Sequence, residues 1–295
     1  MKKLAILSAV FGILLLISNS TLGQSKNDST LCEIETRDGN HFIGTIISME
    51  SDTIHFKTDK LGTLHIAKNF VKKITPLAQN QLKEGEFWAD NPQATRYFFS
   101  PNGYGMKRGE GYYQNVWVLF NQVSFSITDN TSLGAGIVPL FLFAGASSPA
   151  WIAPKFSVPV VKDKVNVGGG ALIGTILGEE EADFGILYGV STFGDRSNNV
   201  NIGVGYGYAG GGLAKTPTIT VSTMLRTGPR GYFISENYYI STAGDYLVLM
   251  SVGGRGFTRG GVGIDWGVVL PLGAGIGEFV AIPWLGITLP FKPKD

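Results

Sequence analysis

The chain has 295 residues, and its 24 basic and 23 acidic side chains nearly cancel, so its charge gives no reason to expect nucleic acid as a partner. The single cysteine, Cys32, excludes an intrachain disulfide. Glycine is unusually frequent: 32 of the 41 glycines lie after residue 110, so the two parts of the chain differ in composition.

The first residues have the features of a secretory signal. Lys2 and Lys3 precede an apolar run from Leu4 to Ile17, and small residues follow it. The run is shorter than the roughly 18 residues that a membrane-spanning helix needs. Residues 1–23 are therefore predicted to be a signal peptide with cleavage near Gly23, and the mature chain is predicted to be exported.

Residues 30–77 show the pattern of a small β domain. Short β-branched runs alternate with polar residues, and Asp38-Gly39 supplies a turn between two of them. About five short strands fit into this length. The stretch 38–66 (DGNHFIGTIISMESDTIHFKTDKLGTLHI) resembles the Sm-like or SH3-like small-barrel module, which implies an interaction domain. RNA binding, which Sm proteins often perform, is not carried over, because the segment has no basic cluster.

Residues 78–110 are expected to form a linker, because Pro92, Pro101 and several glycines interrupt any long element. A candidate first barrel strand lies within this linker at 94–100 (ATRYFFS).

Residues 111–295 form a series of alternating segments separated by turns. In 199–209 the apolar Val200, Ile202 and Val204 share one face, and asparagines and glycines share the other. A soluble sheet would carry hydrophilic side chains on its second face, whereas small residues suit the confined interior of a membrane barrel. Strands are expected near 112–127, 131–143, 151–161, 164–177, 183–193, 199–209, 217–226, 230–241, 245–253, 261–271 and 278–291.

With 94–100 the number of strands becomes twelve, within a range of 10–12. The predicted fold class is all-β: an antiparallel transmembrane β-barrel of about 12 strands, preceded by a small SH3/Sm-like β-barrel domain.

The segment 199–209 contains Gly205 and Gly207, and Gly210 follows it. Together they form Gly205-x-Gly207-x-x-Gly210, which has the spacing of a dinucleotide-binding loop. Such a loop requires a following helix and an acidic residue about 20 positions on. Pro217 and another predicted strand follow instead, and no acid occurs before Glu236. These glycines are therefore interpreted as the inner face of a strand, and no cofactor is expected.

Most charged residues of the barrel region fall in predicted turns, Arg255 to Arg259 among them. Four lie within predicted strands and are candidate lumen-lining residues: Lys155, Arg226, Glu236 and Asp265. The alternation of inward and outward residues along the strands directs Lys155, Arg226 and Asp265 into the lumen. Glu236 instead has the parity of Tyr232 and Ile234, which are expected to face lipid, so a bulge or a reversed strand would be needed.

Two stretches resemble bacterial outer-membrane proteins. Trp284-x-Gly286-x-x-Leu289-x-Phe291 resembles the C-terminal signal of such barrels, although Trp284 replaces a polar residue and four residues follow Phe291. The segment from FWADNPQATRYFFSPNGYG through KRGEGYYQNVWVLFNQVSFSITDN, together with the barrel, resembles a group of uncharacterised exported β-barrel proteins of Gram-negative bacteria. The resemblance implies the cell outer membrane. If the short turns at 129–130, 162–164, 195–198 and 227–229 are periplasmic, the N-terminal domain is periplasmic too.

No histidine lies after residue 65, which excludes catalysis by a histidine base in the barrel. His55 and His65 could meet across two strands, but two imidazoles without a third ligand are a poor metal signal. No catalytic, metal or cofactor site is predicted, and Cys32 is expected to be a buried apolar side chain.

The expected partners are the outer-membrane lipid bilayer and a periplasmic protein that binds residues 30–77. The predicted function is a non-enzymatic narrow pore or a structural anchor. Two alternatives stay open: a secreted soluble barrel that binds an apolar ligand, and an outer-membrane enzyme that works without histidine.

Overall fold

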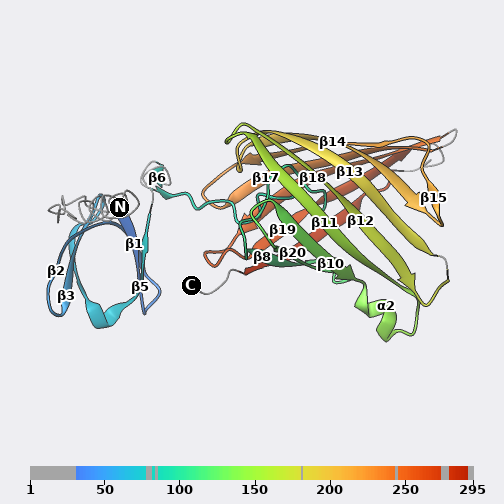
Figure 1. Cartoon of the computed structure of the whole chain (residues 1–295). Helices are drawn as coiled ribbons and strands as arrows, with labels where there is room; N and C mark the ends of the chain where they lie inside the picture. The colour runs from blue at the N-terminus through green and yellow to red at the C-terminus, as the bar shows by residue number, and fades with distance from the viewer. Residues whose placement is uncertain are drawn as a thin grey trace, which may run out of the picture. The chain divides into compact units, whose positions relative to one another are not determined.

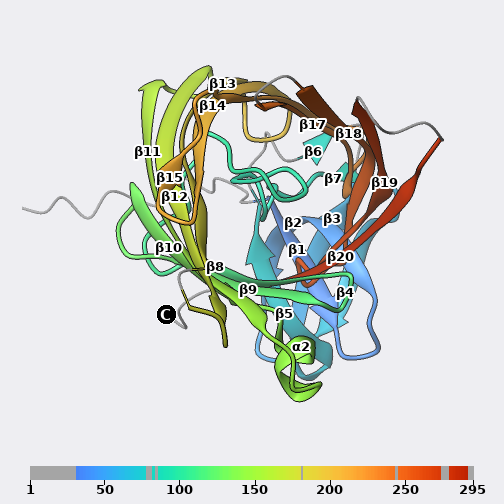
Figure 2. The same cartoon turned by 90° about the vertical axis from the view of Figure 1, so that its right-hand side faces the viewer.

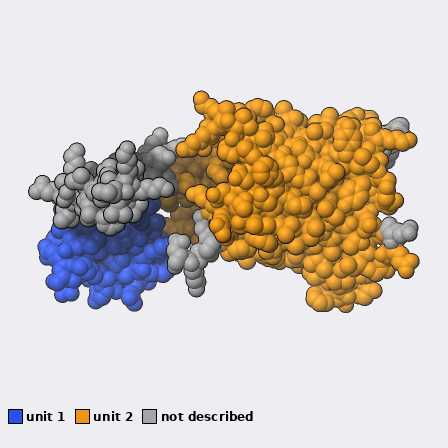
Figure 3. Space-filling view, in the orientation of Figure 1, with its two compact units in different colours: residues 1–85 blue, residues 86–295 orange. Residues whose placement is uncertain are grey.

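The computed structural model describes residues 31–77, 82–83, 86–180, 182–242, 245–273 and 279–291. The predicted signal peptide at 1–23 lies outside these residues. The chain divides into two compact units, residues 1–85 and residues 86–295 (Figure 3).

The described part of the first unit contains an antiparallel sheet of five strands in the order β4-β3-β2-β1-β5. Alternate apolar side chains from β1, β3 and β4 form its core, which consists of Cys32, Ile34, Ile54, Phe56 and Ile66. The elements are β1 (Leu31–Thr36), β2 (His41–Met49), β3 (Thr53–Thr58), β4 (Gly62–Ala67), the 3₁₀ turn η1 (Lys68–Phe70) and β5 (Val71–Pro76). The two-residue strand β6 (Leu82–Lys83) also belongs to this unit, whereas β7 (Glu86–Phe87), likewise of two residues, belongs to the second unit.

The second unit is a closed antiparallel barrel, which twelve strands form among the described residues (Figures 1 and 2). Each strand pairs with its neighbour along the chain, and β20 pairs with β8 to close the ring. The strands are β8 (Gly111–Val116), β9 (Phe120–Ser126), β10 (Thr131–Ile137), β11 (Ser148–Val161), β12 (Val165–Leu177), β13 (Asp183–Gly194), β14 (Asn199–Ala209), β16 (Thr218–Arg226), β17 (Gly231–Thr242), β18 (Asp245–Phe257), β19 (Gly263–Gly273) and β20 (Ile282–Phe291). The two-residue strand β15 (Gly212–Leu213) pairs only with β14. Helix α2 (Pro139–Phe143) follows β10, and within the described residues no helix has the length and apolar character needed to cross a membrane.

The two ends of the barrel differ in which parts of the chain they carry. Because neighbouring strands are antiparallel, β8 begins at the same end at which β20 finishes. The turns 127–130, 162–164, 195–198, 227–230 and 258–262 lie at that end too. We call this end the terminal end and the opposite one the loop end.

The predicted alternation is present in the strands. On β14 the outward Val200, Ile202 and Val204 are 44%, 52% and 49% exposed, whereas the inward Asn199 and Asn201 are 2% and 0% exposed. Large exposed apolar side chains also come from β9, β11, β12, β13 and β16 to β20. The outer face is therefore apolar on most strands of the barrel.

The predicted fold class and the number of strands are confirmed, but three expected elements are wrong. The segment 112–127 is two strands, because Trp117 and Val118 adopt left-handed backbone angles, with φ of 53° and 65°, and turn the chain. The segment 131–143 is β10 followed by helix α2. The candidate strand at 94–100 is not formed, because this segment runs inside the barrel, where side chains bond its backbone.

Candidate functional site in the barrel lumen

Residues 91–106, the lumen segment, run inside the ring of strands (teal in Figures 1 and 2). Arg96, Tyr97 and Phe98 are 2%, 0% and 1% exposed. The segment forms no strand, and its only β pairing is an isolated bridge between its own residues Arg96 and Pro101. Its presence in the lumen therefore depends on contacts with the surrounding strands.

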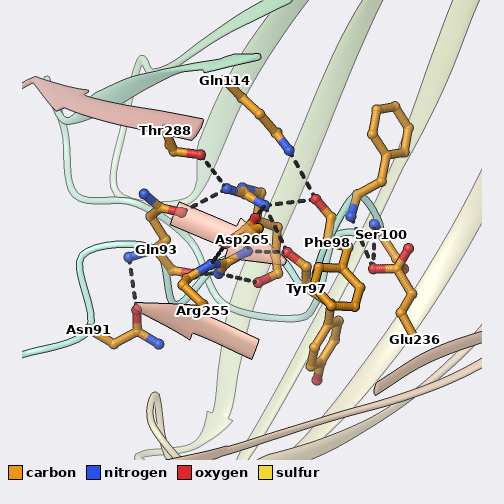
Figure 4. Close-up of polar contacts among 12 residues, drawn as sticks. Asn91, Gln93, Tyr97, Phe98, Ser100, Gln114, Glu236, Arg255, Asp265 and Thr288 are labelled. Atoms are coloured by element: carbon orange, nitrogen blue, oxygen red, sulfur yellow. Dashed lines mark hydrogen bonds and ion pairs between the residues drawn. The ribbon is translucent and has the colours of Figure 1, made fainter. Parts of the chain in front are cut away.

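Two arginines and one aspartate form a buried cluster that joins the segment to the wall (Figure 4). Arg255 on β18 donates from Nε and Nη2 to the two oxygens of Asp265 on β19, at 2.5 and 2.9 Å. Arg96 of the segment donates to Asp265 Oδ2 at 3.1 Å. All three side chains are 3% exposed or less. Because charges interact strongly away from water, each member depends on the others.

Hydrogen bonds from Arg96 extend this cluster along the segment and to the wall. Its Nη2 donates to Gln93 Oε1 at 2.7 Å and to Thr288 Oγ1 on β20 at 2.6 Å. Its Nη1 also donates to the carbonyl oxygen of Tyr97 at 2.8 Å. The guanidinium group therefore contacts both the segment and two neighbouring strands, β19 and β20.

Side chains of the wall also satisfy the backbone of the lumen segment (Figure 4). Glu236 Oε2 on β17 accepts the N–H groups of Phe99 and Ser100, both at 3.0 Å. The carbonyl of Phe98 accepts Gln114 Nε2 from β8 at 2.9 Å. Buried backbone groups need partners, and here wall side chains supply them in place of a strand ladder.

Packing holds the same segment on its other sides. Tyr97 and Phe98 form an apolar cluster with Met224, Tyr232 and Ile234 from β16 and β17. The Tyr97 hydroxyl donates to Asn199 Oδ1 at 2.6 Å. Further along, Gly103 donates its N–H to Thr192 Oγ1 at 2.7 Å, and a Cβ at Gly103 would overlap the carbonyl group of Asn166.

Glu236 lies inside the barrel, which corrects the expected face of β17. Tyr232 and Ile234 were expected to face lipid, but they are 3% and 0% exposed and pack on the lumen segment, so Glu236, which shares their parity, also points inward. The pairing of β17 with β16 and β18 is continuous and contains no bulge, so the reversed orientation of the strand is the one observed. The apolar inner face of this strand packs against the aromatic rings of the segment.

The other three candidates lie at different places in the lumen. Asp265 belongs to the arginine cluster. Lys155 on β11 donates to the carbonyls of Thr95 and Tyr104, at 3.1 and 2.8 Å. Arg226 lies at the terminal end, where its guanidinium group covers the ring of Trp88 and donates to the carbonyl of Pro229 at 2.6 Å. The structure therefore brings Lys155, Glu236 and Asp265 to the lumen segment, while Arg226 binds the following turn.

Sequence reasoning missed Arg96 and Arg255. Arg255 was assigned to a turn, but it lies within β18 and is 0% exposed. A signal was available, because glycines flank Arg255 on both sides and an arginine among small residues has room to point inward. Arg96 is the only charged residue of the aromatic stretch 94–100, which would have marked it as a candidate partner for an acidic strand residue.

In the first unit, His55 and His65 are opposite each other on β3 and β4, with ring centroids 4.4 Å apart. His55 Nε2 lies 3.0 Å from Glu50 Oε1. No group of three or more metal-ligating side chains with suitable geometry occurs among the residues that the structure describes. Cys32 is 3% exposed, and burial raises the pKa of its thiol.

A cavity of about 190 Å³ adjoins the lumen segment. The segment contributes Thr95, Arg96, Phe99, Ser100, Pro101 and Met106 to its lining, and strands β8 to β14, β16 and β17 contribute the remaining residues. On β14 and β17 these residues lie further toward the loop end than those that bond the segment. The cavity is thus a space in the lumen that the segment bounds from the terminal end.

Comparison with protein-family models finds no match, and comparison with curated proteins finds none either. Among solved structures, the chain is similar to a KdgM porin, with a TM-score of 0.46 and 9% sequence identity. The similarity covers 62% of this chain and 99% of the porin chain.

Proposed function

We propose that the protein is an outer-membrane β-barrel that its own lumen segment closes, and that it anchors the N-terminal β domain at the membrane instead of forming an open pore. The observation that carries this proposal is the bonding of residues 91–106 to wall side chains, above all to Asp265 and Glu236.

The outer face of the barrel supports the membrane location. Soluble monomers rarely expose apolar patches larger than a few hundred Å². Here most strands present large apolar side chains outward, while the inner face of β14 carries asparagine and glycine. This arrangement suits a lipid environment outside and a confined interior. The family resemblance and the turns of the terminal end favour the outer membrane with the first unit on the periplasmic side.

The bonding of the lumen segment to the wall supports an anchoring role over conduction. Removing the lumen segment would leave Asp265 with only one of its two arginines, and Glu236 without the two N–H groups that it accepts. Hydrogen bonds to charged groups contribute about 1.5–3 kcal/mol each, and these bonds would be lost. The segment is therefore expected to stay in the lumen.

The first unit supports the interaction part of the role. Its strand order and the 3₁₀ turn before β5 are compatible with the SH3-like or Sm-like module that the sequence resembles. In the described sheet, β4 and β5 are the two outermost strands, and such edges can bind an added strand of a partner. A catalytic role that needs a histidine base is not proposed, because the barrel region has no histidine.

Two measurements test this function. Fractionation of cells that express the full chain should recover it with the outer membrane, and detergent should be needed to extract it. In proteoliposomes the purified protein should admit a small sugar no faster than protein-free vesicles do. Recovery in the soluble periplasm would favour the soluble barrel that binds an apolar ligand, whereas rapid sugar entry would favour the narrow pore.

A further inference from the structure

The cavity beside the lumen segment combines apolar walls with a positively charged end. Leu172, Ile186 and Val190 line it from β12 and β13, and the glycines of β14 that belong to its lining contribute no side chain. Arg96 and Lys155 belong to the same lining. A cavity with one apolar part and one charged part fits a ligand with the same division.

Lys155 has no acidic partner within the described residues. Its Nζ donates to two carbonyl oxygens, those of Thr95 and Tyr104, and none of the ion pairs of the described chain includes it. Neutral carbonyls satisfy hydrogen-bond donors but do not neutralise a charge. A buried ammonium without a counter-charge is unfavourable, so an anion in the cavity would stabilise it.

The balance of lumen charges around the segment also favours a bound anion. Three lumen cations, Arg96, Arg255 and Lys155, surround it together with two buried carboxylates, Glu236 and Asp265, while the exposed Arg196 donates to the carbonyl of Gly105. One positive charge is therefore left over. In addition, Arg96 is a buried residue, 2% exposed, and its Nε has no hydrogen-bond partner. A buried donor without an acceptor is rare in native proteins, and a bound anion is one explanation for it.

We propose that the cavity binds a single-chain amphiphile with one carboxylate, such as a medium-chain fatty acid. The carboxylate lies at Lys155, close to Arg96, and the alkyl chain lies between the walls formed by β12, β13, β14 and β16. The size of the cavity agrees, because an apolar cavity of about 150 Å³ holds a benzene molecule, and this one measures about 190 Å³.

This binding site does not depend on the proposed anchoring role, and its test can fail or succeed separately. The probe is octanoate that carries ¹³C in its carboxyl group, titrated into the full chain in lipid nanodiscs and followed by NMR, with empty nanodiscs as the blank. Saturable binding at one site is expected. Octyltrimethylammonium, which has the same chain and the opposite charge, is expected not to compete.

Two pairs of variants separate the charged end from the apolar part. Lys155→Met should weaken octanoate binding about tenfold or more, because hydrogen bonds to charged groups are among the stronger ones, whereas Lys164→Met in an exposed turn should not. Thr220→Trp should abolish binding by filling the cavity. Val221→Trp changes the next residue of β16, which is 47% exposed on the outer face, and should leave binding unchanged.

The proposal is overturned if octanoate binds no better than to empty nanodiscs, or if the cationic amphiphile competes equally. It is also overturned if Thr220→Trp and Val221→Trp bind octanoate alike. If Lys155→Met fails to fold, the Thr220 and Val221 pair and the competition experiment still decide the outcome.

Discussion

Arg255 and Asp265 are direct cross-strand partners on β18 and β19, and both side chains point into the lumen, where Nε of the arginine lies 2.5 Å from Oδ1 of the aspartate. The same carboxylate accepts a hydrogen bond from Arg96 of the lumen segment. The Arg255–Asp265 ion pair on the barrel wall therefore binds a second cation, Arg96, from a distant part of the chain. This relationship accounts for the segment's position in the lumen.

Asp265→Asn should strongly destabilise the barrel. The substitution leaves Arg96 and Arg255 buried without a negative partner, and breaking a buried ion pair in this way costs about 3–5 kcal/mol. Asp183→Asn, at the exposed start of β13, is the matched control and should have almost no effect. Thermal unfolding in detergent, followed by circular dichroism, checks both. Equal melting temperatures for the two variants would show that the buried cluster contributes little.

Glu236→Ala and Glu236→Gln should differ clearly. Alanine leaves the N–H groups of Phe99 and Ser100 without an acceptor, at about 1–3 kcal/mol for each buried group. The glutamine amide oxygen can still accept them. Hydrogen exchange at these two amides should therefore become much faster in the alanine variant and change little in the glutamine variant. Fast exchange at both amides in the wild-type protein would mean that they do not bond to Glu236 in solution.

Alternation along the strands was sufficient to predict the barrel, its inner and outer faces on β14 and the number of strands. The predicted number of twelve strands agrees with the structure, although the segment 94–100 is not one of them and 112–127 forms two strands. The segment 94–100 contains a threonine and three consecutive aromatic residues, which favour strands, but its real partners, Glu236 and Asp265, are more than 130 positions away. A local pattern carries no information on such distant contacts.

The same limit explains the errors at β8 to β9 and on β17. Trp117 and Val118 are poor turn residues, so the turn that they form has no sequence signal. On β17 the apolar face was taken as the lipid face. An apolar face also suits the lumen when aromatic residues such as Tyr97 and Phe98 fill it.

Val118→Gly should stabilise the barrel. A β-branched residue with φ of 65° is in a region that costs L-residues about 1–2 kcal/mol, and glycine adopts it without that cost. We expect a gain of about 1 kcal/mol in the free energy of unfolding. Val123→Gly, on the outer face of β9, should instead lose about 0.5–1 kcal/mol. Urea-induced unfolding in detergent measures both, and a loss of stability in Val118→Gly would contradict the strained turn.

Cys32 should react slowly with thiol reagents in the folded protein. Burial raises the pKa of its thiol, so at mildly alkaline pH less of the reactive thiolate is present than in an unfolded chain, and access is blocked as well. Ellman's reagent should modify it slowly in buffer and rapidly in denaturant. The rate in buffer should rise as pH increases toward the raised pKa. Rapid modification without denaturant would contradict the burial of β1 in the core of the first unit.

Single-channel recording in planar bilayers tests most directly whether the lumen segment closes the barrel. The wild-type protein should insert without measurable conductance, whereas a variant that combines Glu236→Ala with Asp265→Asn should show intermittent openings, because Phe99 and Ser100 have lost their acceptor and Arg96 its carboxylate partner. Steady conductance from correctly folded wild-type protein, equal to that of the double variant, would contradict a lumen closed by residues 91–106.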